Sequence, residues 1–294
     1  MSNSNAGNWL LSQNKFEHNI GKKLSRKAIT VSVTSGKGGV GKTSISIKIA
    51  RMLAEKGFKV LVIDCDYNLS NTFIKLNLPI KDDFNFLISG VKTFDECIYK
   101  DGNFHLLAAC SGDLDLFDRE IHLDQFILNL LLQIENRYDY IVLDSPAGIN
   151  KQAMTINAYS DYRLVVVTPD KSSITDSYSL IKILNKKYGV KENHLIVNKI
   201  SSEAQYKRIV QIMSETVENF LASRLKIMGG IGRNNRAIDI FDRELFDQSK
   251  DLHKDFCNII SRFTEESLGC CDDNHCGNLN YGCVDDLKHE VLNQ

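Results

Sequence analysis

The sequence predicts a doubly wound α/β fold, in which a mostly parallel sheet carries helices on both faces. Strand patterns alternate with amphipathic helix patterns, the strand cores are almost continuously apolar, and no hairpin signal interrupts the alternation. The composition is that of a globular protein, with 43% hydrophobic and 25% charged residues among 294, which excludes a wholly disordered or coiled-coil chain. No segment has the roughly 18–20 apolar residues of a membrane span, and no export signal is expected.

Seven apolar segments are the predicted strands, and five amphipathic segments are the predicted helices. We expect strands at 28–34, 59–64, 104–109, 138–144, 162–168, 194–198 and 225–228. We expect helices at 42–57, 121–136, 172–188, 202–222 and 252–263, where apolar residues recur every three or four positions. Ser172 or Ser173 is the candidate N-terminal cap of the third helix. The apolar face of the last helix is expected to pack on the core.

Composition divides the chain into three regions. Residues 1–27 form a polar arm with five Lys/Arg and one acidic residue. Residues 28–266 are expected to form a single α/β domain without an internal linker. Residues 267–294 form a tail with five acidic residues, one lysine and four cysteines. The formal net charge of -1 argues against a protein covered in basic residues for nucleic-acid binding.

A glycine-rich phosphate-binding loop lies between the first predicted strand and the first predicted helix. The segment 36–43 reads GKGGVGKT and matches the spacing of a P-loop. Glycines let backbone amides surround phosphate oxygens, and the start of the helix adds partial positive charge. Lys42 is expected to reach the β- and γ-phosphates and Thr43 to bind Mg²⁺. The predicted nucleotide-binding residues of this loop are Gly36, Lys37, Gly38, Gly39, Val40, Gly41, Lys42, Thr43 and Ser44.

The same glycines also fit a dinucleotide-binding fingerprint. Gly36, Gly38 and Gly41 have the required spacing, and Asp64 ends the next strand, where a ribose-binding acid belongs. The pair Lys42–Thr43 favours a nucleoside triphosphate, because a dinucleotide has no use for a lysine and a hydroxyl at the helix start.

Three carboxylates follow buried strands. Asp64 and Asp66 close the second predicted strand, on the same side of its end, and Asp144 closes the fourth. Parallel α/β sheets bind ligands at the carboxyl ends of their strands, and acids near a phosphate loop hold Mg²⁺ through water. Capping of the following loops is the alternative role for a single aspartate, but three such residues together favour a metal site.

These motifs together resemble the deviant-Walker-A ATPases of the MinD/ParA class. The resemblance rests on the segments 37–43 (KGGVGKT), 64–71 (DCDYNLSN) and 144–149 (DSPAGI), and it covers about residues 28–265. The additional lysine of that class is Lys37. The segment 168–182 (TPDKSSITDSYSLIK) is similar to the flagellar-number regulators of the FlhG/FleN branch.

The resemblance implies a role for each matching residue. Lys37 would cross to the phosphates of a partner subunit in an ATP-bound dimer, and Asp66 would position the attacking water, so the implied catalytic residues are Lys37, Lys42 and Asp66. Asp64 and Asp144 would support Mg²⁺ together with Thr43, and Asn198 would read adenine. Asn71 and Gly148 would lie in the two switch segments. At 229–234 the chain departs from the family, since Gly232 and Asn234 replace a proline and an aspartate.

The resemblance also implies a function. It predicts a magnesium-dependent ATPase with slow, partner-stimulated hydrolysis, which dimerises with ATP and controls the placement or number of flagella together with a flagellar GTPase or regulator. MinD-like division-site placement, ParA-like cargo positioning and a metal-cluster carrier or assembly scaffold are the alternatives. The expected location is the cytoplasm, with recruitment to the inner face of the membrane or a cell pole left open.

The cysteine-rich tail is a candidate metal site. Cys270, Cys271, His275, Cys276 and Cys283 offer enough ligands for Zn²⁺ or an iron–sulfur cluster, but their spacing is not standard, and an acidic tail without metal is the alternative. The tail lacks the basic amphipathic helix that docks on anionic lipid. Four basic residues, Arg224, Lys226, Arg233 and Arg236, are a weak candidate for a nucleic-acid-binding face, so nucleic acid is not an expected partner.

Overall fold

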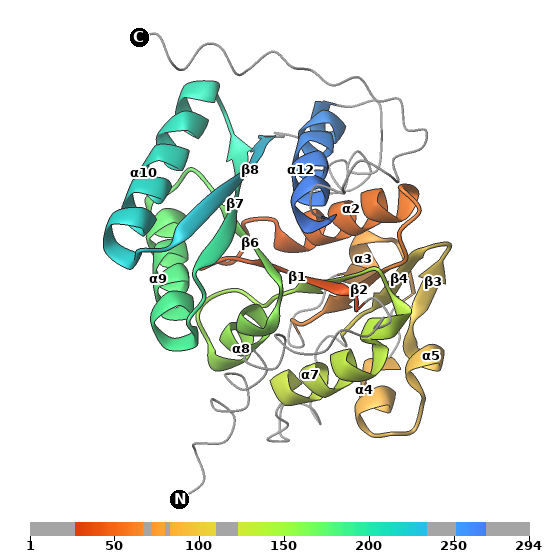
Figure 1. Ribbon diagram of the computed structural model, residues 1–294. Coiled ribbons are helices and arrows are strands. Elements are labelled where there is room, and N and C mark those ends of the chain that lie inside the picture. Colours follow the sequence, from red (N-terminus) through yellow and green to blue (C-terminus); the bar gives the residue numbers. More distant parts are fainter. Residues whose placement is uncertain (1–26, 67–71, 80–82, 110–122, 234–250, 269–294) are drawn as a thin grey trace, which may run out of the picture.

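An eight-stranded sheet forms the centre of the molecule. The computed structural model describes residues 27–66, 72–79, 83–109, 123–233 and 251–268 (Figure 1). The strand order is β3-β4-β2-β5-β1-β6-β7-β8. The strands are β1 (Ile29–Thr34), β2 (Val60–Asp64), β3 (Tyr99–Asp101), β4 (Phe104–Leu107), β5 (Tyr140–Asp144), β6 (Tyr162–Val167), β7 (Glu192–Ile200) and β8 (Arg224–Gly232). Every neighbouring pair is parallel except β3 and β4. The predicted α/β fold class is therefore confirmed.

Helices cover both faces of this sheet (Figure 1). One face packs against α2 (Lys42–Glu55) and α12 (Asp251–Leu268). The other face packs against α7 (Leu123–Ile134), α8 (Lys151–Tyr159), α9 (Lys171–Tyr188) and α10 (Glu203–Leu221). No helix of the described residues is both long and apolar enough to cross a membrane.

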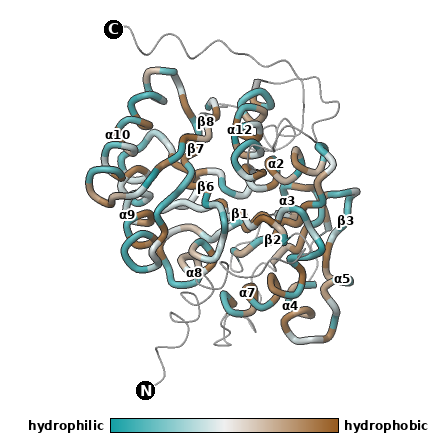
Figure 2. Tube along the Cα trace, in the orientation of Figure 1, coloured by the Kyte–Doolittle hydropathy of each residue, from teal (hydrophilic) through white to brown (hydrophobic). Residues whose placement is uncertain are grey.

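Alternating side chains along each strand supply both faces of the core. Val31 and Val33 of β1 join the α2–α12 face, whereas Leu61 and Ile63 of β2 join the opposite face. Successive strand side chains point to opposite faces, so a strand that is apolar throughout contributes to two hydrophobic layers. Hydrophobic residues are concentrated on the central strands, and hydrophilic ones on the outward turns of helices such as α10 (Figure 2). This explains why the strand segments read as nearly continuous apolar runs.

The last helix packs as expected. Five buried side chains of α12 lie in the α2–α12 face of the core: Leu252, Phe256, Ile259, Ile260 and Phe263. Side chains of α12 also meet the backbone of β8, the edge strand. The Arg262 guanidinium donates to the carbonyls of Ile227 and Met228 at 3.4 Å each, and the Gly232 amide donates to Asp255 Oδ2 at 2.9 Å.

The expectation that the chain contains no hairpin is wrong. Strand β3 pairs antiparallel with β4, and Gly102 in the turn between them has a φ of 57°. Only three residues long, β3 lacks the alternation by which strands are recognised in a sequence. Four helices are not predicted by the sequence patterns: α3 (Thr72–Lys75), α4 (Asp83–Ile88), α5 (Phe94–Cys97) and α8. The helix predicted at 121–136 ends at Ile134, and a short 3-10 turn, Glu135–Arg137, follows it.

The cap of helix α9 also differs from the expectation. Asp170, rather than Ser172 or Ser173, is the N-cap residue, and its carboxylate accepts a hydrogen bond from the Ser173 amide at 2.9 Å. Aspartate is as good a cap as serine, and the extended backbone of Asp170 leaves its side chain free to turn back toward the helix. The helix therefore begins one residue earlier than predicted.

Candidate functional site

The phosphate loop joins the end of β1 to the start of α2, as the motif requires. Gly39 and Gly41 have φ angles of 73° and 103°, in the left-handed region that favours glycine. Gly41 is the N-cap of α2 and has no side chain to occupy the space above the helix. The first amides of α2 therefore remain available to an anion at the point where the helix dipole is positive.

Gly36 fixes the base of the loop against helix α9. A Cβ at this position would lie 2.1 Å from the backbone carbonyl carbon of Asp176, so only glycine fits here. The Gly36 amide lies 3.4 Å from the Ser177 hydroxyl, which accepts its hydrogen bond. Close backbone packing against α9 thus holds the start of the loop in place before any ligand is bound.

Lys42 points into the loop and is nearly buried. The residue is only 9% exposed, and its ammonium donates to the Ser35 hydroxyl at 3.2 Å. Burial lowers the pKa of Lys42, and the nearby charges of Asp144 and Asp66 oppose that shift. A buried ammonium held beside empty loop amides is well placed to bind phosphate oxygens.

Two strand-end carboxylates lie side by side next to the loop. In the sheet register Asp64 of β2 is paired with Asp144 of β5. Burial and the neighbouring charge of Asp64 raise the pKa of Asp144 to about 7, although a hydrogen bond from Thr43 acts in the opposite direction. The Ser46 hydroxyl donates to Asp144 Oδ1 at 3.1 Å. Asp64 accepts from the Asp66 amide at 3.0 Å on one oxygen and from the Thr72 hydroxyl on the other.

The donor set fits Mg²⁺. A cavity of about 430 Å³ is lined by the loop residues 38–39 and 41–44, by Asp64, Asp66 and Asp144, and by Lys75 of α3. Carboxylate and hydroxyl oxygens are the ligands that Mg²⁺ prefers. Burial first, and then the charge of Asp64, raises the pKa of Asp144, so a divalent cation between these carboxylates and a phosphate would stabilise their ionised forms. Thr43, Asp64 and Asp144 would hold the ion, which supplies charge neutralisation at the phosphates.

The pKa of Asp144 leads to a prediction about pH. Below pH 7 the carboxyl is protonated, so MgADP should bind about tenfold more weakly at pH 6 than at pH 8, as expected for one group with a pKa near 7. Calorimetric titration measures the affinity; ADP in EDTA is the control, and an equal pH dependence without Mg²⁺ would contradict the assignment.

The same pKa predicts how the stability of the protein without nucleotide depends on pH. Because the folded pKa of Asp144 lies above the unfolded value near 4, the free energy of unfolding should fall as pH rises from 4 to 7.

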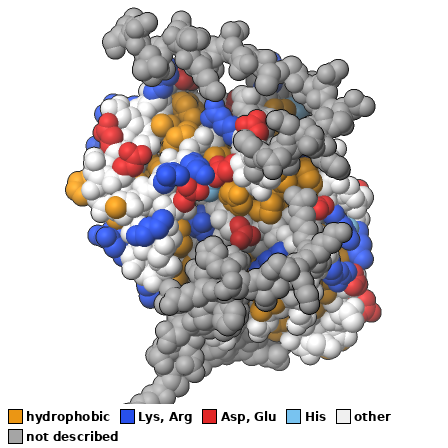
Figure 3. All heavy atoms as spheres, in the orientation of Figure 1, with side chains coloured by type: hydrophobic (Ala, Val, Ile, Leu, Met, Phe, Trp, Pro, Cys, Tyr) orange, Lys and Arg blue, Asp and Glu red, His pale blue; other side chains and the backbone are white. Residues whose placement is uncertain are grey.

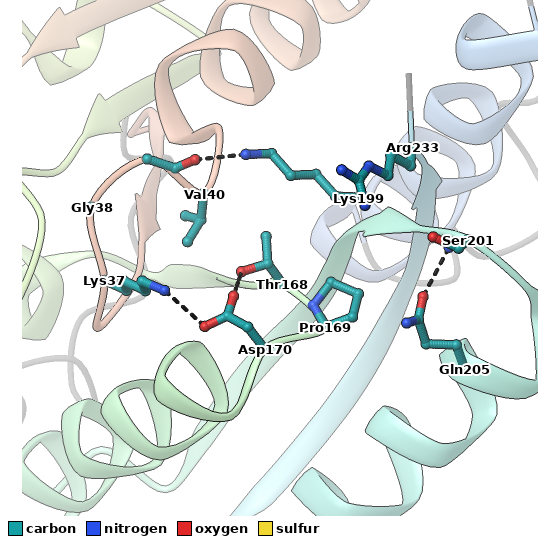
Figure 4. Close-up of a pocket in the computed structure, with 11 residues that line it drawn as sticks. Lys37, Gly38, Val40, Thr168, Pro169, Asp170, Lys199, Ser201, Gln205 and Arg233 are labelled. Carbon is teal, nitrogen blue, oxygen red and sulfur yellow. Dashed lines mark hydrogen bonds and ion pairs between the residues drawn. The ribbon is translucent and has the colours of Figure 1, made fainter. Parts of the chain in front are cut away.

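Lys37 points to the other side of the loop. Its ammonium lies 2.8 Å from Asp170 Oδ1 (Figure 4). It also lies 2.8 Å from the Ser172 hydroxyl. The Thr168 hydroxyl donates to the second oxygen of Asp170 at 2.6 Å. The hydrogen bond from Lys37 has the largest effect on the pKa of Asp170. Together with the hydrogen bonds from Thr168, Ser172 and Ser173, it holds that pKa well below its usual range. Both side chains of the ion pair are about 40% exposed, so solvent weakens it.

The end of β7 supports the outer wall of the loop. Asn198 donates through Nδ2 to the Val40 carbonyl at 2.7 Å. Lys199 donates to the Gly39 carbonyl at 2.8 Å (Figure 4). Lys199 has a φ of 61°, unusual for a residue with a long side chain. Asn198, implied as the adenine reader, therefore braces the loop in this structure. A second cavity of about 300 Å³ lies here, lined by Lys37, Lys199 and Arg233 among others.

A family model described as an AAA domain, AAA_31, matches residues 28–200, more than half of the chain. This chain is a P-loop ATPase of the MinD/ParA class. Among its curated relatives, the antiactivator FleN of Pseudomonas aeruginosa is 29% identical over 206 residues, covering 68% of this chain and 72% of FleN. The flagellum site-determining protein YlxH of Helicobacter pylori is 32% identical over 218 residues, covering 73% of this chain and 72% of YlxH.

Solved structures of MinD share the fold. MinD in a MinC:MinD complex of Aquifex aeolicus is 27% identical with a TM-score of 0.62, covering 81% of this chain and 96% of that one. MinD of Pyrococcus horikoshii, complexed with Mg-ADP, has a TM-score of 0.67 at 20% identity, covering 82% and 97%. The resemblance to the MinD/ParA class inferred from the P-loop and the strand-end aspartates is therefore confirmed.

This MinD/ParA-class ATPase uses residues that sequence patterns did not reveal. Asp170 and Lys199 contact the loop, Lys75 lines the cavity beside it, and Thr72 donates to Asp64 in the lining of that cavity. Asp170 lies within the segment 168–182 that resembles the FlhG/FleN branch, but no role was expected for it, and the other three belong to no recognised motif. Asp170 lies three residues after the end of β6, where polar residues meet ligands in α/β sheets. That position could have singled out Asp170, whereas α3 carries no such signal.

Several predicted residues lie outside the described part of the chain: Asn71, Asn234, Arg236, Cys270, Cys271, His275, Cys276 and Cys283. The tail metal site and the polar arm therefore stay predictions.

Of the four residues proposed as a basic face, Arg224 pairs with Glu192, and Lys226 pairs with Glu192 and Glu266. On the face drawn in Figure 3, positive and negative side chains of the described residues are interspersed. This mixture does not favour a nucleic-acid-binding surface.

Proposed function

We propose that this protein is an ATP-hydrolysing switch, dimeric with ATP bound, that controls the placement or number of flagella. The observation that carries the proposal is the constellation at one loop: Lys42 and Thr43 inside it, Asp66 and Asp144 at the adjacent strand ends, and Lys37 on its outer side. Lys42, Thr43 and the carboxylates bind Mg²⁺ and the phosphates. Asp66 positions the attacking water, and positive charge at the transferring phosphate stabilises the transition state.

The position of Lys37 supports the proposed dimerisation. The side chain is attached to the loop but extends toward Asp170 and Ser172, away from the cavity that Lys42 enters. A lysine on the exposed outer side of a phosphate loop can reach a nucleotide held by a second copy. The ion pair between Lys37 and Asp170 competes with that reach, so it restrains Lys37 until the pair is broken.

Breaking that ion pair should favour the dimer. Asp170→Ser removes the carboxylate but keeps a side chain able to cap α9. We expect the ATP-dependent dimer to form at a concentration about two- to fivefold lower, since exposed ion pairs contribute up to about 1 kcal/mol. Sedimentation with non-hydrolysable AMPPNP measures the dimer. Asp176→Ser, within the same helix, is the matched control, and an unchanged or weakened dimer in Asp170→Ser would contradict the restraint.

The similarity of this chain to the antiactivator FleN and to the flagellum site-determining protein YlxH supports the flagellar part of the proposal. Deleting the gene and counting flagella and minicells in the same cells tests it. Altered flagellar number or position with normal division would support the proposal. Division is scored as well, because the same switch could instead serve septum placement. The MinD of Escherichia coli is 30% identical over 250 residues, which favours septum placement as a second candidate. Minicells with normal flagella would support that candidate and contradict the first.

The partner of this switch follows from the same comparison. MinD of Aquifex aeolicus has been solved in complex with MinC. By analogy, we propose that the ATP-bound dimer here is read by a flagellar GTPase or regulator that stimulates hydrolysis. Its place of action would be the cytoplasm, at the inner membrane face or a cell pole. Phosphate release that rises when the purified partner is added would support this reading.

A further inference from the structure

Helix α3 is tied to the magnesium site by a buried hydrogen bond. Thr72, its first residue, is 1% exposed and donates its hydroxyl to Asp64 Oδ2. The other oxygen of Asp64 accepts the Asp66 amide at 3.0 Å. A carboxylate that accepts two fixed donors has little freedom to turn. The start of α3 is therefore held at a defined place beside the candidate Mg²⁺ ligand.

Lys75 lies on the same face of this helix as Thr72. The two residues are three positions apart, so both side chains face the same neighbour. Lys75 lines the cavity that also contains Lys42, Asp64 and Asp66. It is half-buried there, in contrast to Ile74, which is 67% exposed. The cavity thus receives one lysine from the phosphate loop and a second from α3.

The charges of the cavity give Lys75 a purpose. Its lining contains three carboxylates, Asp64, Asp66 and Asp144, against the two lysines. Without Lys75 the excess of negative charge would double, which disfavours an incoming triphosphate. Asp64 would help to hold the Mg²⁺ that neutralises the terminal phosphates, so a lysine anchored next to Asp64 would face the terminal phosphate rather than the base.

We propose that Lys75 is a further phosphate-binding residue, which contacts the terminal phosphate of a bound nucleoside triphosphate, and that Thr72 positions it by anchoring α3 to Asp64. The inference rests on the nucleotide binding in the proposed function and extends it. Lys75 lets a single subunit distinguish triphosphate from diphosphate while Lys37 is still engaged by Asp170. Recognition of the γ-phosphate would then precede dimer formation.

The test compares two affinities in the full chain. Binding of AMPPNP and of ADP, each with Mg²⁺, is measured by calorimetry at protein concentrations where the chain is monomeric. Lys75→Met should weaken AMPPNP about 10-fold, the effect of one charge-assisted hydrogen bond, and change ADP less than about twofold. Lys75→Arg should keep most of the preference for AMPPNP. Thr72→Val should lose part of it, and Thr72→Ser should retain it.

A lysine elsewhere controls for the loss of one positive charge. Lys186 is exposed in the last turn of α9, so Lys186→Met should leave both affinities within about twofold, as expected for a solvated charge screened by salt. Equal weakening of AMPPNP and ADP by Lys75→Met, or no weakening of either, would overturn the role of Lys75 and leave the proposed function intact. A wild-type protein that binds neither nucleotide would overturn both.

Discussion

Lys42→Ala is expected to abolish nucleotide binding. The variant removes the ammonium that enters the loop, so the phosphates lose the positive charge that Lys42 places beside the loop amides. We expect the affinity for ADP and AMPPNP to fall by at least about a hundredfold, because truncating one partner of a buried, hydrogen-bonded charge pair costs several kcal/mol. Fluorescence titration with a labelled ADP measures the loss.

Two controls make this result interpretable. Lys42 is buried, so thermal unfolding must first establish that Lys42→Ala remains folded; a buried ammonium without a ligand is not expected to stabilise the protein. Lys186→Ala, at an exposed position of α9, should bind both nucleotides normally. Binding by Lys42→Ala within about tenfold of wild type, far less than the loss of a buried charge pair predicts, would mean that the loop does not hold the phosphates as proposed.

Asp66→Ala should stop hydrolysis and trap the ATP-bound dimer. Asp66 lines the same cavity as Asp64, and among the described residues its carboxylate caps no helix, so its removal is expected to leave the phosphate contacts in place. Loss of the residue that positions water should reduce phosphate release by about 10²–10⁴-fold, the usual contribution of such a group. Light scattering should then show a dimer that persists with ATP and dissociates when ATP is removed.

The conservative variant Asp66→Asn separates charge from shape. It retains the size and a hydrogen-bonding oxygen but not the negative charge, so it should hydrolyse slowly and dimerise like Asp66→Ala. The cavity then carries one negative charge fewer, and AMPPNP should bind at least as tightly as in the wild type. A variant that stays monomeric with AMPPNP would argue against the switch mechanism, whereas normal hydrolysis would argue only against the role of Asp66.

The central sheet and the phosphate loop could be predicted because their signals are local. A buried parallel strand is apolar throughout, as 60–64 and 140–144 are, and the loop between 36 and 43 must use glycines whatever surrounds it. The adjacency of Asp64 and Asp144 followed from their positions at the ends of strands. These features depend on nearby residues and on one general rule of sheet topology.

The remaining part of the site depends on contacts between distant segments. Asp170 pairs with Lys37 across 133 positions, and Lys199 reaches Gly39 across 160. Helix α3 is one turn long and lacks an apolar period, so nothing in its sequence places Lys75 near the loop. Partners of this kind are set by how β6, β7 and α3 pack around the loop, which periodicity does not encode.

Both edges of the sheet limit how two copies can meet. An exposed edge strand invites a second chain to add its own strand. Here β3 offers only three residues for pairing, and on β8 the Arg262 guanidinium and the Asp255 carboxylate already engage backbone groups from Ile227 to Gly232. A continuous sixteen-stranded sheet across a dimer is therefore not expected. Assembly must instead use a surface of side chains and loops, which can form and separate within one nucleotide cycle far more readily than a shared ladder of backbone hydrogen bonds.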